Sequence, residues 1–137
     1  MKNIMCVACG FIAYAAAADC KAEVDLNTSS IADEAWYVPG WMRTNEPEEL
    51  AWKSFLEVFS TTKNHFHKWD GNQLWPIAVK NADVEATKFA DEIKRMPEKR
   101  RARLTLVGHS LGGRIVARTL AKLSADGIKI KRGILLA

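Results

Sequence analysis

A chain of 137 residues with 48% hydrophobic and 26% charged side chains has the composition of one folded globular domain, which excludes a disordered chain. Its net charge of +4 is too small an excess to indicate nucleic-acid binding by itself. A dense basic stretch between residues 94 and 103 stands beside no recognisable RNA- or DNA-binding module. We therefore expect a solvated helix end and link there, and no nucleic-acid partner.

The first 18 residues differ from the rest of the chain. One lysine, Lys2, precedes an uncharged apolar run from Ile4 to Ala18, which ends in alanines before Asp19. This order is typical of a signal peptide, so we predict one over residues 1–18 and a secreted or periplasmic protein. The run is shorter than the about 20 apolar residues that a bilayer requires, so we expect no stable membrane span. The alternative is that the run is a helix or strand of the domain itself, in a cytoplasmic protein.

The cysteines do not predict a metal site. Cys6 and Cys9 have C-x-x-C spacing, but they lie in the apolar run, and no second pair or histidine stands nearby. We expect no bound metal.

The first half of the chain predicts a strand, a helix and a second strand. Residues 19–34 are polar and predict a linker, so the domain is expected over residues 35–137. Ala35 to Val38 form a short apolar run that Pro39-Gly40 ends, which is typical of a buried strand before a turn. Residues 43–59 carry helix start signals, and residues 64–69 are a candidate strand before a loop over 70–76. The apolar residues of that helix recur at helical spacing and predict its buried face: Leu50, Ala51, Phe55, Val58 and Phe59.

The second half continues the alternation. We predict a helix over 80–96, a charged link over 97–103, a strand over 104–107, a helix from 111 to about 124 and a last strand over 131–137. The predicted buried faces of the two helices are Ala82, Ala86, Phe89, Ile93 and Met96, then Val116, Leu120 and Leu123. Strands that alternate with helices at this spacing are typical of βαβ units. The sequence therefore predicts an α/β fold, a parallel sheet with helices on both faces.

One predicted turn contains the candidate catalytic residue. Gly108, His109, Ser110, Leu111 and Gly112 match the pattern G-x-S-x-G between a predicted strand and a predicted helix. In such a turn the serine has a strained backbone, and the glycines at either side have no Cβ to clash with neighbouring backbone. We expect Gly113 to allow close helix packing as well. The alternative is a glycine-rich turn in which Ser110 only caps the helix.

The stretch "LTLVGHSLGG" resembles the nucleophile elbow of the α/β-hydrolase superfamily, in the form common among lipases and esterases. The resemblance covers roughly residues 35–137 and implies an incomplete α/β-hydrolase fold. It implies a serine hydrolase that acts on carboxylic esters, with Ser110 as nucleophile and a small ester or lipid as substrate. No metal or organic cofactor is expected.

The resemblance also implies an oxyanion hole. In the family, the strand two before the elbow strand ends in an oxyanion loop, and here that place is held by Pro39-Gly40. The backbone N–H groups of Leu111 and Trp41 would then bind the oxyanion. Apolar residues after the strand ends on the same edge suggest a substrate cleft, which we predict to include Met42, Trp69 and Trp75. The alternative for the tryptophans is packing in the core or crevice.

The partners of the serine are missing from the sequence. In this family the catalytic acid and histidine follow the serine, whereas His65, His67 and His109 all precede Ser110. Asp126 is the only later carboxylate, and we expect it at the opposite edge of the sheet. Two hypotheses follow. The chain is the N-terminal part of a longer hydrolase, as the apolar end of the last strand suggests, or it is a non-catalytic α/β-hydrolase-like binding protein without a triad.

Overall fold

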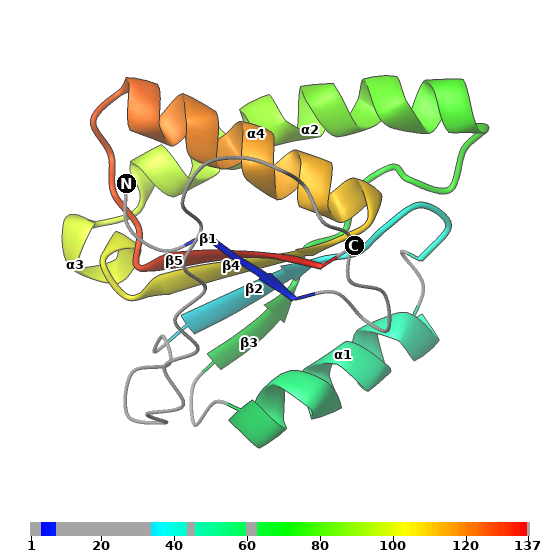
Figure 1. The fold of residues 1–137 in the computed structure, drawn as a ribbon, viewed down its shortest axis with the longest axis horizontal. Coiled ribbons are helices and arrows are strands. Elements are labelled where there is room, and N and C mark those ends of the chain that lie inside the picture. The colour runs from blue at the N-terminus through cyan, green and yellow to red at the C-terminus, as the bar shows by residue number, and fades with distance from the viewer. Residues whose placement is uncertain (1–3, 8–33, 44–45, 60–62, 137) are drawn as a thin grey trace.

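The protein folds as a parallel β-sheet with helices on both faces (Figure 1). The structure is a computed structural model that describes residues 4–7, 34–43, 46–59 and 63–136. The strands in this part are β1 (Ile4–Val7), β2 (Glu34–Val38), β3 (Lys63–Phe66), β4 (Leu104–His109) and β5 (Arg132–Leu136). The helices are α1 (Glu46–Phe59), α2 (Trp75–Arg95), α3 (Glu98–Arg101) and α4 (Leu111–Ala125).

The strand order places a topological switch between β2 and β4. The described strands lie in the order β1-β5-β4-β2-β3, and every neighbouring pair is parallel. From β2 the chain passes through α1 to β3 on one side, and it then returns through α2 to β4 on the other side. The chain therefore leaves β2 and β4 in opposite directions. In open α/β sheets ligands bind at the carboxyl edge at such a point.

Two layers of helix bury the two faces of the sheet. Figure 1 shows α2 and α4 side by side over one face and α1 beneath the other. The larger core lies between the sheet and the first layer, where Phe89, Ile93 and Ile115 are fully buried beside Leu104 and Leu106 of β4. The smaller core, on the side of α1, contains Tyr37 and Val107, and Trp52 of α1 packs against it.

The predicted α/β class and parallel sheet are confirmed, as are the buried positions predicted for α2 and α4. The side chains of Phe55, Val58 and Phe59, predicted to be buried in α1, lie outside the described residues. All five predicted positions of α2 are buried, and so are Val116 and Leu123 of α4, with Leu120 partly buried. The predicted buried faces are correct because residues spaced by three and four lie on one side of a helix, whatever that helix packs against.

Strand β1 was not expected. It pairs with β5, with Ile4 beside Gly133, within the run predicted as a signal peptide. A strand there is what the alternative interpretation, an N-terminal element of the domain, predicts. Residues 8–33, which include most of the predicted linker, lie outside the described residues. The signal peptide stays a prediction.

Several boundaries differ from those predicted: β3 ends at Phe66 instead of residue 69, and β4 continues to His109 instead of ending at residue 107. The largest difference is at α2. Helix α2 begins at Trp75, five residues before the predicted start, with Pro76 in its first turn, a position that proline favours because its missing N–H costs nothing there. Ala78 thereby joins the buried stripe. The short helix α3 occupies the predicted link.

The predicted buried face of α1 was wrong at its first turns. Leu50 is 69% exposed and Ala51 is also exposed, whereas Trp52 stacks on Tyr37 with 4.0 Å between the ring centroids. Residues two apart lie about 200° apart around a helix, so a helix that turns Trp52 to the sheet turns Leu50 to solvent.

Candidate functional site

Ser110 stands alone between the end of β4 and the start of α4. Its backbone angles are φ 52° and ψ −121°, a conformation that costs a non-glycine residue about 1–3 kcal/mol. The backbone N–H of Ser110 donates to the carbonyl oxygen of Leu136, 2.9 Å away, which holds the turn against β5. The side chain is exposed, and its hydroxyl caps none of the first amides of α4. The alternative role, a plain helix cap, therefore does not describe this serine.

The tight turn depends on two glycines. A Cβ on Gly108 would lie 2.5 Å from the carbonyl oxygen of Gly112, and a Cβ on Gly112 would overlap the carbonyl oxygen of Val38. The predicted need for glycine at both places is thus confirmed. Gly113 is different, because a Cβ there would meet its nearest neighbour at 3.5 Å, an ordinary contact. The helix packs against Gly108 at Gly113, and this packing would also accommodate a Cβ there.

The loop after β2 lies directly beside Ser110. Val38 pairs with Gly108 in the β2–β4 register, so the next residues of the two strands run side by side. A Cβ built on Gly40 would lie 3.0 Å from Cβ and 3.4 Å from Oγ of Ser110. The structure therefore brings together the two segments that the sequence marked separately, Pro39-Gly40 and the serine turn.

The amides named as oxyanion donors stand at these two segments. Leu111 is the first residue of α4, and the N–H groups of a first turn have no acceptor within their helix. Its partial positive charge is increased by the helix dipole. Trp41 follows Gly40 in the loop beside Ser110.

The loop after β2 is locked to the loop after β3. The indole N–H of Trp69 donates to the carbonyl oxygen of Pro39 at 2.8 Å, and that of Trp41 donates to Gln73 O at 2.7 Å. The backbone N–H of Met42 donates to Gly71 O at 3.3 Å. Sequence reasoning missed Gly71 and Gln73, for which the only signal was the turn-forming run Asp70-Gly71-Asn72.

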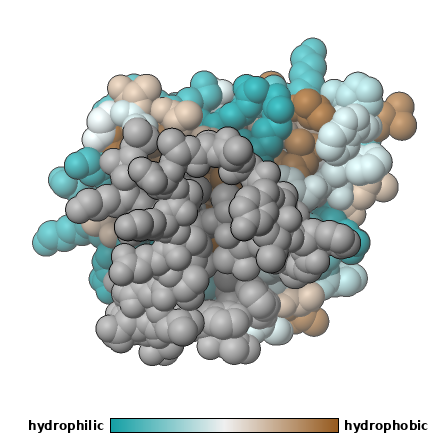
Figure 2. Space-filling model, viewed as in Figure 1, coloured by the Kyte–Doolittle hydropathy of each residue, from teal (hydrophilic) through white to brown (hydrophobic). Residues whose placement is uncertain are grey.

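The predicted cleft residues divide into two groups. Trp69 is 6% exposed and lies in the larger core, so packing describes it. Trp41, Met42 and Trp75 are 40%, 55% and 50% exposed, and the indoles of Trp41 and Trp75 meet edge to face at 5.3 Å. Leu74 and Ile77 extend this exposed apolar surface into α2. Figure 2 shows apolar atoms at the surface where α2 begins.

The histidines occupy other places. The ring of His109 lies on the α1 side of the sheet, 6.1 Å from the Trp52 ring. The rings of His65 and His67 both lie against Trp36, so the two histidines share one face of the sheet.

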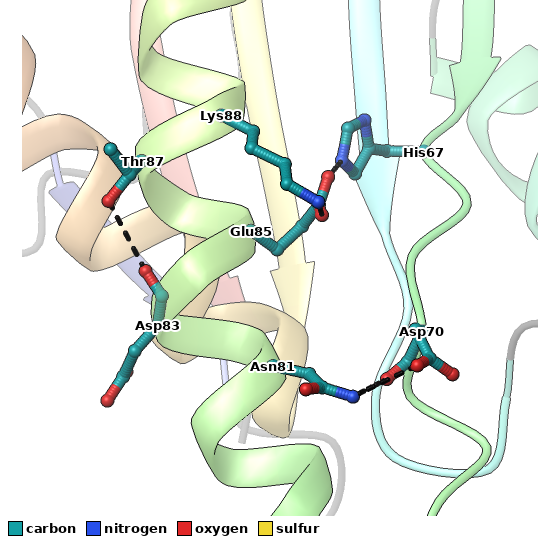
Figure 3. A network of polar contacts seen from close by, with 7 residues as sticks. All are labelled: His67, Asp70, Asn81, Asp83, Glu85, Thr87 and Lys88. Atoms are coloured by element: carbon teal, nitrogen blue, oxygen red, sulfur yellow. Dashed lines mark hydrogen bonds and ion pairs between the residues drawn. The ribbon is translucent and has the colours of Figure 1, made fainter.

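His67 forms a buried pair with a carboxylate of α2. Its Nε2 lies 2.9 Å from Oε1 of Glu85, and Lys88 lies 3.8 Å from the other oxygen (Figure 3). The hydrogen bond from His67 lowers the pKa of Glu85. The His67 ring stacks on Phe89 with 4.1 Å between centroids. This imidazole is thus engaged by a stacked ring and by a carboxylate in the core of the domain, which describes a structural role.

Several basic residues of the described part of the chain form ion pairs between elements. Arg114 and Arg118 of α4 both bind Asp83 of α2, at 2.8 and 3.0 Å, and the hydrogen bond from Arg114 lowers the pKa of Asp83. Lys94 binds Asp126 at the far end of α4, so that carboxylate is engaged away from the serine turn. Arg100 binds Glu34.

The described residues include no membrane-spanning helix and no cluster of metal ligands. None of the helices there is long and apolar enough to cross a bilayer. No three histidine, cysteine, aspartate or glutamate side chains in this part of the chain come together as metal ligands would.

Comparisons with protein-family models, with curated proteins and with solved structures find no match to this chain. The function must therefore be argued from the geometry of the serine turn and its neighbouring loops.

Proposed function

We propose that the domain presents Ser110 as the nucleophile of an ester hydrolase with an incomplete α/β-hydrolase fold. The observation that carries the proposal is the strained backbone of an exposed serine at a helix start, next to a loop that approaches its Oγ. Strain at a position that the surrounding structure enforces is typical of functional sites. The resemblance of "GHSLGG" to the family's elbow supports the same conclusion.

The chemistry assigned to these residues is acylation. Oγ of Ser110 would form a bond to the carbonyl carbon of an ester, and the carbonyl oxygen would become an oxyanion held by the N–H groups of Leu111 and Trp41. Collapse of that intermediate breaks the ester C–O bond and releases the alcohol. The exposed surface of Trp41, Met42 and Trp75 would contact an apolar acyl group.

The serine proton must pass to a base. The resemblance assigns that task to a histidine after the serine, and this sequence has none after Ser110. An oxyanion hole and substrate binding alone retain about 10³-fold acceleration over water in a serine protease that lacks its triad. The nucleophile and the oxyanion donors can therefore be tested without knowing the base.

The test is covalent labelling with an alkyl fluorophosphonate, followed by mapping of the modified residue. The Oγ–P bond forms, the P–F bond breaks, fluoride leaves and the hydroxyl proton goes to solvent. Ser124, exposed near the end of α4, is the matched control within the same chain. We expect the adduct on Ser110 well ahead of Ser124, and no such adduct in Ser110→Ala. Equal labelling of the two serines would show that the turn does not activate Ser110.

The second candidate is a non-catalytic binding protein that uses the same edge of the sheet. The placement of the three histidine rings favours it, since His65 and His67 lie against Trp36 and His109 lies beside Trp52. Hydrolysis of activated short- and medium-chain esters separates the two. Turnover that Ser110→Ala abolishes supports the enzyme. Equal rates in the parent and in Ser110→Ala support the binding protein.

A further inference from the structure

The loop beside Ser110 has little support from the sheet. Strand β2 ends at Val38, so Gly40, Trp41 and Met42 lie beyond the ladder that fixes the strand. Three hydrogen bonds attach the residues from Pro39 to Met42 to the loop after β3, through Pro39 O, the Trp41 indole and the Met42 amide. The position of the loop therefore depends on residues about 30 positions later in the chain.

Trp69 is the most firmly held of these partners. Its ring is buried in the larger core with Val38 and Ala78. A Cβ on Gly71 would lie 2.6 Å from Cζ2 of the ring, so the chain folds back tightly over the indole. The Gly71 N–H donates to Trp69 O at 2.9 Å and closes that turn. The indole N–H of Trp69 thus has a fixed place.

The loop after β3 is also tied to α2. The side-chain amide of Asn81 donates to the backbone oxygen of Asp70 at 3.0 Å and to its carboxylate at 3.1 Å, and Figure 3 shows this contact. Gln73 donates to the other carboxylate oxygen of Asp70 at 2.9 Å. Helix α2 therefore anchors the loop after β3, and through that loop it also anchors the loop after β2.

The Pro39 carbonyl connects the loop after β3 to the serine turn. It receives the Trp69 indole N–H, and it stands 2.5 Å from where a Cβ on Gly112 would lie. The carbonyl is therefore confined between the indole and the first turn of α4. A fixed carbonyl fixes the plane of its peptide, because the peptide unit is rigid. The Gly40 backbone that follows is held next to Oγ of Ser110.

We infer that Trp69 is a positioning residue, whose indole N–H fixes the Gly40–Trp41 backbone beside Ser110. Its role in chemistry rests on the function proposed for Ser110, whereas its role in ordering the loop does not. Loss of one preorganised oxyanion donor costs about 10²–10³ in rate, so a donor that is only loosened should cost about tenfold.

The first experiment measures the loop itself. Trp69→Phe keeps an aromatic ring and removes the N–H. Trp36→Phe is the matched control, because the Trp36 indole N–H also donates to an acceptor, Glu34 Oε1 at 2.7 Å, where β2 begins. Hydrogen exchange by NMR reports two protons that cross between the loops, the Met42 amide and the Trp41 indole N–H. We expect both to lose about tenfold protection in Trp69→Phe and to change less than twofold in Trp36→Phe. Unchanged protection in Trp69→Phe would overturn the inference.

The second experiment measures the rate of Ser110 labelling by the fluorophosphonate in the same variants. We expect about tenfold slower labelling in Trp69→Phe and an unchanged rate in Trp36→Phe. A looser loop with an unchanged labelling rate would overturn the role in chemistry. If Ser110 of the unmodified protein is not labelled, only the proposed function is contradicted. The hydrogen-exchange data then still test whether Trp69 orders the loop.

An isosteric side chain guards against loss of folding. If circular dichroism shows that Trp69→Phe is unfolded, a benzothienylalanine incorporated at position 69 replaces it, because sulfur takes the place of the N–H that donates to Pro39 while the size of the ring is kept. The same loss of protection at Met42 and Trp41 is expected. Protection equal to that of the parent would again overturn the inference.

Discussion

The α-carbon of Gly112 packs so closely against Val38 that a Cβ on the glycine would overlap the valine carbonyl oxygen. This contact joins the first turn of α4 to the end of β2, across the topological switch of the sheet. This contact fixes the positions of the two segments next to Ser110, the end of β2 and the first turn of α4.

Gly112→Ala should therefore be strongly destabilising. The added methyl group must displace backbone, and overpacking of this kind costs about 1–3 kcal/mol. Gly113→Ala is the matched control on the same helix turn, where the Cβ has room, and alanine favours the helix by about 0.5–1 kcal/mol. Thermal and urea unfolding of both variants check this. A Gly112→Ala protein as stable as Gly113→Ala would contradict the packing described here.

The strain at Ser110 predicts a stabilising substitution. Ser110→Gly and Ser110→Ala both remove the hydroxyl, but only glycine adopts φ 52° and ψ −121° without strain. We expect Ser110→Gly to unfold with a free energy about 1 kcal/mol higher than Ser110→Ala. Chemical denaturation of the pair measures the difference. Equal stabilities would show that the turn relaxes once the hydroxyl is gone.

Acid should weaken the ion pair of Glu34. The hydrogen bond from Arg100 holds the pKa of this carboxyl at about 2, below its ordinary value of 4.5. Because the folded pKa is depressed, the stabilisation is present above about pH 4.5 and is lost as the pH falls toward 2. Glu34→Gln should cost about 2 kcal/mol at neutral pH, allowing for the exposure of the Arg100 side chain, and nothing near pH 2.

Unfolding free energies at several pH values test this prediction. Glu49→Gln is the comparison, since Glu49 also has a lowered pKa, caused by Lys53 and Lys68, but its side chain is more exposed than that of Glu34. A smaller effect is expected there because solvent screens exposed pairs. A parent and Glu34→Gln that differ equally at all pH values would contradict the titration.

The Asp83 contacts between α2 and α4 should be weak and sensitive to salt. Asp83 accepts from Arg114 and Arg118, and both arginine side chains are exposed. Asp83→Asn should lower the melting temperature slightly in dilute buffer. The difference should vanish at about 1 M NaCl, where the screening length is about 3 Å. A difference that persists in high salt would show that packing, not charge, joins the helices there.

Local features of this protein followed from the sequence alone. The buried faces of α2 and α4 and the need for glycine at position 108 depend on residues a few positions apart, whereas the need for glycine at position 112 comes from Val38, far away in the chain. Helical spacing and steric exclusion within the turn act over a few positions, so neighbouring residues in the sequence are enough to predict these local features. The start of α2 could also have been read from Pro76 in its first turn.

What only the tertiary structure decided depends on residues far apart in the chain. The rotation of α1 follows from the stacking of Trp52 on Tyr37, and the pairing of Arg114 and Arg118 with Asp83 joins two helices. Trp69 could not be separated from the cleft tryptophans by sequence, because its burial and its hydrogen bond to Pro39 arise when two loops meet. Sequence periodicity says which side of an element is apolar, but the element that covers that side is chosen by the packing of the whole domain.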